Sequence, residues 1–264
     1  MGATYFHNMV ANERSFDRLF CDVICYKYYC AYYNKEFTED PIFNHIVLED
    51  ALSVVPHPDS TFEQVLSDSS LTATRLKIPV SIFVDKHLPW SGRFAQIAID
   101  RDFRIAEKMN ILAKGVAEVS ATANDKIRVA TTRNVELWND TFIRAYSIPN
   151  AWKEELLRRE RASLNDSRTM LLLAEEINGE LKASGCLLLH VEPKEWMGVY
   201  CVGTLPERRH KGIARALLLA SELIALERGC KFLTLQTVVS DGVTPMYQEI
   251  GYRIEFERDI LQAT

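Results

Sequence analysis

Apolar and polar positions in the second half of the chain alternate in a pattern that predicts most of its elements. Apolar residues recur at helical spacing through Asn134–Tyr146 and predict a helix there. Asn178-Gly179 separates two apolar runs and predicts a hairpin, because both residues tolerate positive φ. The predicted order is strand, helix, helix, three strands, helix, strand, helix and strand. The strands are expected at Ile127–Thr132, Met170–Ile177, Leu181–Val191, Met197–Thr204, Lys231–Val239 and Tyr252–Leu261, and the remaining helices at Trp152–Arg161, Ile213–Arg228 and Thr244–Ile250.

The first half has a weaker pattern that still predicts both kinds of element. Helices are expected at Ser15–Tyr33, Ser60–Arg75 and Ser91–Ile99, and strands at Ile42–Leu48, Pro79–Asp85 and Phe103–Leu112. The segment Gly115–Lys126 is small and polar, and is the best candidate for a linker. We therefore expect an α/β fold, a mixed sheet flanked by helices, in two domains over residues 1–118 and 126–264.

Composition narrows the classes of protein that fit this pattern. The chain of 264 residues is 47% hydrophobic and 25% charged, as in soluble globular proteins. Its formal net charge of −5 provides no overall cationic field for nucleic acid or an anionic membrane. The first residues lack a secretory apolar core, and no apolar run approaches the ~18 residues of a membrane span. A cytoplasmic protein that binds neither nucleic acid nor membrane is expected.

The six cysteines lack the paired spacing of metal sites. Three of them, Cys21, Cys25 and Cys30, lie in an aromatic run that the pattern assigns to a helix. We expect buried or half-buried thiols in a reducing compartment, and no metal. Cys201 has no His and Asp partners that would mark a nucleophile, so we interpret it as structural.

The stretch PERRHKGIAR, Pro206–Arg215, stands between a predicted strand and a predicted helix. The first N–H groups of a helix lack intrahelical partners, and together with the helix dipole they form a site suited to phosphate. Gly212 removes a side chain where a ligand would approach the backbone, and Ala214 keeps the next approach narrow. Arg209 and Lys211 add charge suited to a polyphosphate. By itself, the basic run RRHK is more typical of a solvated turn at the head of a helix.

The spacing R-x-x-G-x-A over Arg209–Ala214, after a strand that ends VGTLPE, resembles the acyl-CoA site of the GNAT acyltransferase superfamily. The motif of that superfamily is Q/R-x-x-G-x-G/A in the same strand-to-helix setting. The resemblance extends over Ile127–Leu261, and SDGVTPMYQEIGY is similar to the superfamily's end, where a tyrosine precedes a Gly-aromatic pair. The dinucleotide pattern GxGxxG and the GKS or GKT of a Walker loop are absent.

The resemblance implies acetyl-CoA as cosubstrate and no metal. The backbone of Val202–Thr204 would pair with the pantetheine arm, and amides from Arg209 through Arg215 would surround the pyrophosphate. His210 replaces the most common glycine, and its imidazole either donates to phosphate or points to solvent. Ser240 stands where the family often has asparagine. The implied cofactor contacts are Val202, Gly203, Thr204, Arg209, His210, Lys211, Gly212, Ile213, Ala214, Arg215 and Ser240.

The implied chemistry is attack of a neutral amine on a thioester, which needs a base, a donor to the carbonyl oxygen and a proton for the thiolate. Tyr247 matches the tyrosine whose hydroxyl would protonate the CoA sulfur; the alternative is that it packs on the cofactor. Some family members carry a glutamate on the strand before the loop, a place that falls near Gly198 here. The candidate bases are Glu195, just upstream, and Glu176 or its neighbour Glu175; a water chain fits equally well.

The first half is similar, in element order and in its FNH triplet, to the amino-terminal half of tandem GNAT proteins, where a degenerate copy of the fold precedes the active one. It has no Q/R-x-x-G-x-G/A motif before residue 200, so we expect it to shape the acceptor pocket rather than bind CoA. Its aromatic run Tyr26–Tyr33 fits either a pocket wall or a core.

These features predict an acyl-CoA-dependent N-acetyltransferase that transfers acetyl directly to a primary amine in a ternary complex. A non-catalytic CoA-binding module and an aminoacyl transferase of tandem GNAT type are the alternatives; the acidic composition disfavours the second, which would need an RNA-linked donor. Small metabolite amines, aminoglycoside-like drugs, polyamines and peptide amino termini all fit as acceptors. The protein is expected to be a monomer or a homodimer.

Overall fold

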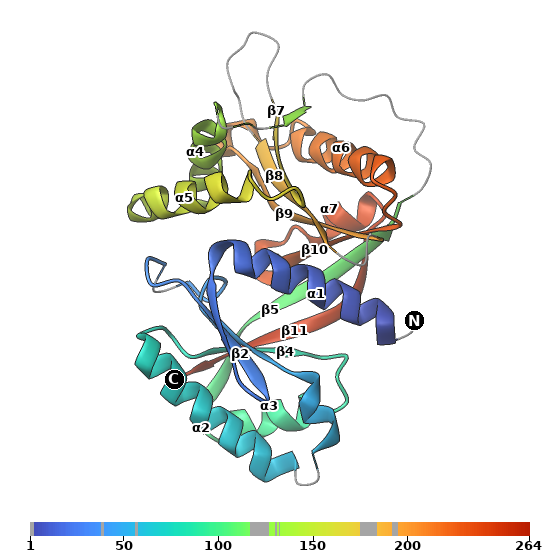
Figure 1. The fold of residues 1–264 in the computed structure, drawn as a ribbon. Helices are drawn as coiled ribbons and strands as arrows, with labels where there is room; N and C mark the ends of the chain where they lie inside the picture. Colours follow the sequence, from blue (N-terminus) through green and yellow to red (C-terminus); the bar gives the residue numbers. More distant parts are fainter. Residues whose placement is uncertain are drawn as a thin grey trace. The chain divides into compact units, whose positions relative to one another are not determined.

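The computed structural model describes residues 3–37, 40–55, 58–116, 127–129, 131, 133–174, 184–191 and 195–264. The chain forms two compact units (Figure 1). Unit 1 comprises Met1–Leu19 and Ala113–Leu235, and unit 2 comprises Phe20–Leu112 and Gln236–Thr264. Both are mixed α/β structures, as the sequence predicts.

Unit 1 contains the strand order β10-β9-β8-β7-β6. β9 and β10 are parallel, and the other neighbours are antiparallel. Helices α4 and α6 both pack against β8 and β9, and α5 packs against α4 (Figure 1). The elements are α1 (Ala3–Phe20), β6 (Ile127–Val129), α4 (Val135–Tyr146), η2 (Asn150–Trp152), α5 (Lys153–Ser163), β7 (Thr169–Ala174), β8 (Ser184–Val191), β9 (Trp196–Thr204), η3 (Pro206–Arg208), α6 (Ile213–Glu227) and β10 (Phe232–Val238).

The core of unit 1 forms where α4 meets the strands. Trp138 is fully buried, and its indole Nε1–H donates to the carbonyl of Leu172 on β7 at 3.0 Å. Helix α1 packs on β9, where Phe16 stacks on Tyr200 with ring centroids 4.0 Å apart. Burial of large aromatic side chains is the main stabilising term for such contacts. The apolar side chains that recur over Asn134–Tyr146 are therefore those that α4 buries.

Unit 2 contains the strand order β1-β2-β3-β4-β11-β5. Its core joins the strands to α2 and α3 through buried residues such as Phe62, Ile82, Phe94 and Leu261. The elements are β1 (Asp22–Cys25), β2 (Tyr29–Tyr33), β3 (His45–Leu48), η1 (Asp50–Val54), α2 (Pro58–Leu76), β4 (Ser81–Asp85), α3 (Ser91–Ile99), β5 (Phe103–Gly115), η4 (Val239–Asp241), α7 (Thr244–Glu249) and β11 (Arg253–Ala263).

The final strand, β11, pairs antiparallel with β4 of the first half. Arg258 lies opposite Asp85 in this register, and its Nε donates to the Asp85 carboxylate at 2.5 Å with both side chains buried. The carboxy-terminal segment thus belongs to unit 2, whereas α1 belongs mainly to unit 1. A division between residues 118 and 126 does not separate these units, because strand pairing rather than chain order assigns a segment to a unit. The expected linker falls largely in residues 117–126, outside the described ranges.

The helix expected over Ser15–Tyr33 is wrong in its second part. Helix α1 ends at Phe20, and the aromatic run that follows forms the β1–β2 hairpin. β-Branched and aromatic residues such as Val23, Ile24 and Tyr29 favour strands, which a count of apolar positions did not detect.

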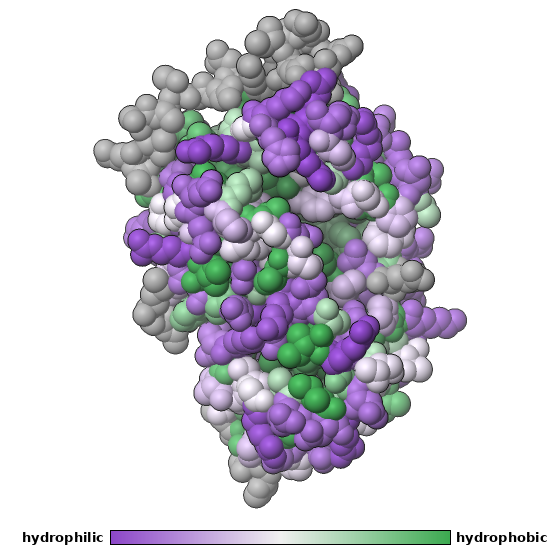
Figure 2. All heavy atoms as spheres, turned by 180° about the vertical axis from the view of Figure 1, so that it is seen from behind, coloured by the Kyte–Doolittle hydropathy of each residue, from purple (hydrophilic) through white to green (hydrophobic). Residues whose placement is uncertain are grey.

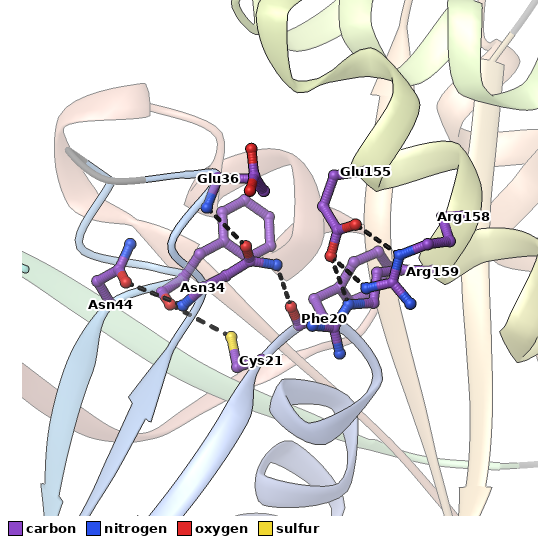
Figure 3. Close-up of polar contacts among 9 residues, drawn as sticks. Phe20, Cys21, Asn34, Glu36, Asn44, Glu155, Arg158 and Arg159 are labelled. Carbon is purple, nitrogen blue, oxygen red and sulfur yellow. Dashed lines mark hydrogen bonds and ion pairs between the residues drawn. The ribbon is translucent and has the colours of Figure 1, made fainter. Parts of the chain in front are cut away.

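Asn34 stabilises the end of this hairpin (Figure 3). Its Nδ2 donates to the Phe20 carbonyl at 2.7 Å, and its backbone N–H donates to Asn44 Oδ1 at 3.0 Å. Asn44 Nδ2 in turn donates to the carbonyl of Phe37 at 2.6 Å. Bonds from side-chain amides therefore satisfy backbone groups at the point where the predicted helix stops.

The same hairpin corrects the expectation of reduced thiols at Cys25 and Cys30. These residues lie opposite each other in the β1–β2 register and form a disulfide. Only the strand pairing brings them together, because a helix would have pointed them in different directions. Cys21 and Cys230 are buried and not disulfide-bonded.

The surface drawn in Figure 2 is mainly hydrophilic, with hydrophobic residues in small scattered groups. Large apolar side chains that are partly exposed include Ile105, Leu71 and Tyr146. Within the described ranges, no helix combines the length and apolar character required to cross a membrane.

Candidate functional site

A β-bulge interrupts β9 just before its end. The register with β8 steps from Leu187–Tyr200 to Gly185–Gly203, so β9 uses one more residue than β8 over this distance. Cys201, within the bulge, has φ +56°. A left-handed conformation is uncommon for cysteine, and it changes the direction of the strand's peptide groups. The bulge lies at the start of the segment for which the sequence predicts cofactor contacts.

β9 pairs with β10 near the amino end of β9, away from the bulge. The parallel pairs join Trp196, Met197 and Gly198 to the segment Phe232–Thr234. From Val199 onward β9 continues beside β8 through its bulge to Thr204. The two parallel strands are therefore in register at the amino end of β9, and the bulge follows beyond the last of these pairs.

The loop after β9 is a 3₁₀ turn followed by two residues in the left-handed region. Pro206–Arg208 forms the turn, and the Arg208 N–H donates to the Leu205 carbonyl at 2.8 Å. His210 has φ +61° and Gly212 has φ +75°. Successive backbone N–H groups in turns that contain left-handed residues are a known kind of anion-binding concavity.

Gly212 is the N-cap of α6, and its carbonyl accepts the first intrahelical bond, from the Ala216 N–H at 3.0 Å. The N–H groups of Gly212–Arg215 thus precede the hydrogen-bond ladder of the helix. A Cβ placed on Gly212 would meet no atom within 4 Å, so the space beside it is open. The predicted phosphate site therefore has an accessible backbone, and the positive end of the α6 dipole lies at it.

The left-handed φ of His210 gives a physical reason for the family's glycine at this position. Glycine adopts positive φ without steric cost, whereas a residue with a Cβ loses about 1 kcal/mol. His210 is exposed and carries this cost.

Arg209 connects the loop to the end of α4. Its Nη2 donates to the Ala145 carbonyl at 3.0 Å, and its Nε donates to the Thr204 carbonyl at 3.3 Å. The Arg209 backbone N–H donates to the Pro206 carbonyl at 3.3 Å. The sequence predicts that this guanidinium adds positive charge for a polyphosphate. In the structure its two hydrogen bonds within unit 1 instead go to backbone carbonyls.

Tyr146, in the last turn of α4, is a neighbour of the site that the sequence did not indicate. Its hydroxyl donates to the Val202 carbonyl at 2.9 Å. A Cβ on Gly203 would lie 2.8 Å from both Ala145 Cβ and Tyr146 Cε2, so only glycine fits here without a shift. The helical pattern placed Tyr146 at the end of a helix, but no local signal links that end to β9.

Glu195, one candidate base, lies just before β9 begins. Its carboxylate forms an ion pair with Lys231, and its carbonyl accepts bonds from the N–H groups of Lys231 and Phe232 at 2.8 and 2.9 Å. A strand rises about 3.3 Å per residue, so Glu195 is roughly 20 Å along β9 from Cys201. The structure does not bring Glu195 to the bulge. Glu175 and Glu176 lie outside the described residues.

Gly198, where some family members have a glutamate, leaves no room for a side chain. A Cβ there would overlap Asn12 Oδ1 and the ring of Tyr200. The Tyr200 hydroxyl donates to Asn12 Oδ1 at 2.7 Å, and both residues are buried. Helix α1 therefore occupies this face of β9, and a carboxylate at 198 is sterically excluded.

Tyr247 and Ser240, the remaining predicted site residues, belong to unit 2. Tyr247 is buried on α7, and its ring packs edge-on against Tyr252 with centroids 5.9 Å apart. The Ser240 hydroxyl donates to Glu107 on β5. This bond lowers the pKa of the Glu107 carboxyl. Ser240 therefore has a protein partner within its own unit.

Comparison with known proteins agrees with this arrangement. Residues 132–252 match the model of the Acetyltransferase (GNAT) family, which includes β9, the loop and α6. Comparison with curated protein sequences gives no match.

Solved structures share the fold over nearly the whole chain. A GCN5-related N-acetyltransferase from Kribbella flavida aligns with a TM-score of 0.71 at 14% identity, over 97% of this chain and 94% of its own. One from Sphaerobacter thermophilus aligns with 0.67 at 14% identity, over 96% and 90%. A conserved protein of unknown function from Staphylococcus epidermidis aligns with 0.65 at 12% identity, over 92% and 94%.

The bulge in β9, the left-handed loop and the start of α6 lie within the matched residues, and the fold prediction is confirmed over both halves of the chain. The carboxy-terminal half of this chain carries a domain of the GNAT acetyltransferase family.

Proposed function

We propose that the protein is an N-acetyltransferase that transfers an acetyl group from acetyl-CoA directly to a primary amine. The observation that carries the proposal is the sequence R-x-x-G-x-A in a loop whose left-handed His210 and Gly212 lead into the start of α6. This loop follows a bulged strand, and both lie within the residues that match the GNAT family.

The donor would bind along β9 and across the loop. Backbone groups of Val202–Thr204 would pair with the pantetheine arm as an added strand does with a sheet edge. The N–H groups of Lys211–Arg215 would surround the pyrophosphate, at the positive end of α6. Lys211 and Arg215 are exposed and would add charge. No metal is part of this proposal.

The reaction forms a C–N bond and breaks the thioester C–S bond. The neutral amine attacks the acetyl carbonyl, whose oxygen gains negative charge and requires N–H donors. Backbone N–H groups at the Cys201 bulge are the proposed donors, since a bulge redirects peptide groups out of the strand ladder. The amine loses a proton to the base, and the Tyr247 hydroxyl supplies a proton to the leaving thiolate.

The base is a water chain in this proposal, or Glu176. The ion pair of Glu195 and its place at the start of β9 disfavour it, and the contacts of Gly198 exclude a carboxylate there. A base that acts through water needs a path to solvent rather than direct contact with the amine.

The same contacts at Gly198 favour a second candidate, a module that binds CoA without catalysis. Both candidates require the loop to bind the pyrophosphate. They differ in turnover: the enzyme acetylates an amine, and its Tyr247→Phe variant loses turnover with little change in CoA affinity.

Calorimetric titration with acetyl-CoA tests the proposal. We expect micromolar binding by the wild type and none by Gly212→Glu, which places bulk and negative charge at the pyrophosphate site. The matched control is Gly229→Glu at the other end of α6, because Gly229 also has positive φ (+74°) and open space beside it. The control should bind like the wild type. Absence of wild-type binding would refute the proposal.

If the wild type binds, release of the CoA thiol is measured with a panel of amines. The panel contains small metabolite amines, an aminoglycoside, a polyamine and a peptide with a free amino terminus. Turnover on any of these supports the enzyme, and binding without turnover on all of them supports the non-catalytic module.

A further inference from the structure

The last turn of α4 makes direct contacts with the backbone that follows the bulge in β9. The Tyr146 hydroxyl donates to the Val202 carbonyl at 2.9 Å, and its ring and the Ala145 methyl lie against Gly203. Tyr146 is 48% exposed, so its hydroxyl could bond with water and yet bonds with this carbonyl. The contact connects residues far apart in the sequence.

Hydrogen bonds from Arg209 also join the loop to the same turn of α4. Arg209 Nη2 donates to the Ala145 carbonyl at 3.0 Å, and Nε donates to the Thr204 carbonyl at 3.3 Å. The Ala145 carbonyl belongs to the last turn of α4, where carbonyls lack intrahelical donors. The guanidinium also lies at the negative end of the α4 dipole, which favours a cation.

These contacts hold both ends of the segment Val202–Arg209. A peptide group is planar, so a hydrogen bond that fixes the Val202 carbonyl also fixes the direction of the Gly203 N–H. Likewise, the bond to Thr204 fixes the peptide group at the start of the loop. The backbone to which the donor would bind is therefore oriented by side chains of α4 and the loop, as preorganisation requires.

We infer that Tyr146 and Arg209 are positioning residues of the acyl-donor site, and that Arg209 acts through hydrogen bonds to α4 and β9 rather than through its charge on the phosphates. The inference rests on the proposed function, since it concerns the same acetyl-CoA site. It extends that site to α4, which lies outside the loop motif, and assigns a different role to the motif's first residue.

The first test is Tyr146→Phe, which keeps the ring on Gly203 and removes the hydroxyl. One hydrogen bond of this kind corresponds to roughly a three- to tenfold change in an equilibrium constant. We expect acetyl-CoA Kd to rise by that factor while the melting temperature stays unchanged, because the hydroxyl is at the surface. The matched control is Asp140→Asn on the same helix, whose exposed ion pair with Lys153 of α5 (2.7 Å) involves neither β9 nor the loop.

The second test compares two replacements of Arg209. Met keeps the length of the side chain and removes every donor, whereas Gln keeps an N–H donor and removes the charge. We expect Arg209→Met to raise the Kd of acetyl-CoA roughly ten- to a hundredfold, as for loss of bonds from a charged donor. Arg209→Gln should recover most of this loss.

The salt dependence of acetyl-CoA binding distinguishes a positioning role of Arg209 from direct attraction between its charge and the phosphates. Salt screens charge–charge attraction between exposed groups, so loss of a phosphate-binding cation reduces the dependence of Kd on ionic strength. We expect this reduction for Lys211→Met and not for Arg209→Met.

The outcomes separate the inference from the proposed function. If the wild type binds acetyl-CoA and both Tyr146→Phe and Arg209→Met bind equally well, the inference is wrong and the proposed function stands. If Arg209→Gln binds as weakly as Arg209→Met and both lose salt dependence, Arg209 acts by charge, which also overturns the inference. If the wild type does not bind at all, the proposed function fails, and the inference fails with it.

Discussion

Asn139 on α4 and Glu160 on α5 meet with both side chains fully buried, and Asn139 Nδ2 donates to Glu160 Oε1 at 3.1 Å. The other carboxyl oxygen, Glu160 Oε2, and Asn139 Oδ1 have no hydrogen-bond partner among the described residues. A carboxyl group that is protonated in this site avoids the cost of a buried charge. Burial raises the pKa of Glu160 from 4.5 to about 8.

This pair predicts a pH dependence of stability. Between pH 4.5 and about 8 the folded protein holds a proton on Glu160 that the unfolded chain has lost. The free energy of unfolding should therefore fall as pH rises through this range, by up to about 1.4 kcal/mol per pH unit, and level off above it. Denaturant unfolding at several pH values measures the slope.

Glu160→Gln should remove this contribution to the slope, because glutamine carries no titrating proton. The matched control is Glu155→Gln on the same helix, where bonds from Arg158 lower the pKa of Glu155 to about 2 (Figure 3). Glu155 is ionised in both folded and unfolded states over about pH 6–8, so its loss should shift stability without changing the slope in that range. An unchanged slope in Glu160→Gln would contradict the assignment.

Gly203→Ala should destabilise the protein and weaken acetyl-CoA binding. The added methyl would lie 2.8 Å from Ala145 and Tyr146, so α4 must shift from β9. Overpacking of this kind costs about 1–3 kcal/mol. Gly92→Ala is the control, because a Cβ there meets no atom within 4 Å and alanine favours the helix α3. A Gly203→Ala variant as stable as the wild type would show that α4 moves away from β9 at little cost in free energy.

Gly198→Glu, which restores the residue of some family members, should destabilise the protein rather than increase turnover. The new side chain would overlap Asn12 and the Tyr200 ring and place a charge where both neighbours are buried. We expect a loss of several kcal/mol, since burial of an unpaired charge adds to the steric cost. A thermal melt measures it. A stable, more active variant would mean that α1 leaves this face of β9.

Cys201 should react with iodoacetamide faster than Cys230, and acetyl-CoA should slow its reaction. Cys201 is partly exposed on the bulge, whereas burial raises the pKa of Cys230 to about 11. The thiolate is the reactive form, so Cys230 should react at least about tenfold more slowly. Peptide mass spectrometry after timed labelling gives both rates. Equal labelling of Cys201 with and without saturating acetyl-CoA would argue against donor binding along β9.

Most elements of the second half were predictable because their apolar periodicity is strong. The helix over Ile213–Arg228 and its end at Gly229 agree with α6, and Gly229 has the left-handed φ that a helix end favours. The run after Phe20 was not predictable by the same means, since its apolar residues fit a helix as well as a hairpin. Asn34 and Asn44 decide between the two, and their partners lie in other segments.

Sequence alone predicted most elements of the second half, the R-x-x-G-x-A loop between β9 and α6, and the resemblance to the GNAT family, because each depends on residues close together in the chain. The tertiary structure decided which segments share a unit: β11 pairs with β4, and α1 packs on β9. It also decided that Arg209 bonds to Ala145 and that Gly198 has no room for a base. Such contacts join segments that are distant in the sequence. A local pattern states which face of an element is buried, but not which partner buries it, because many apolar faces are compatible before they pack.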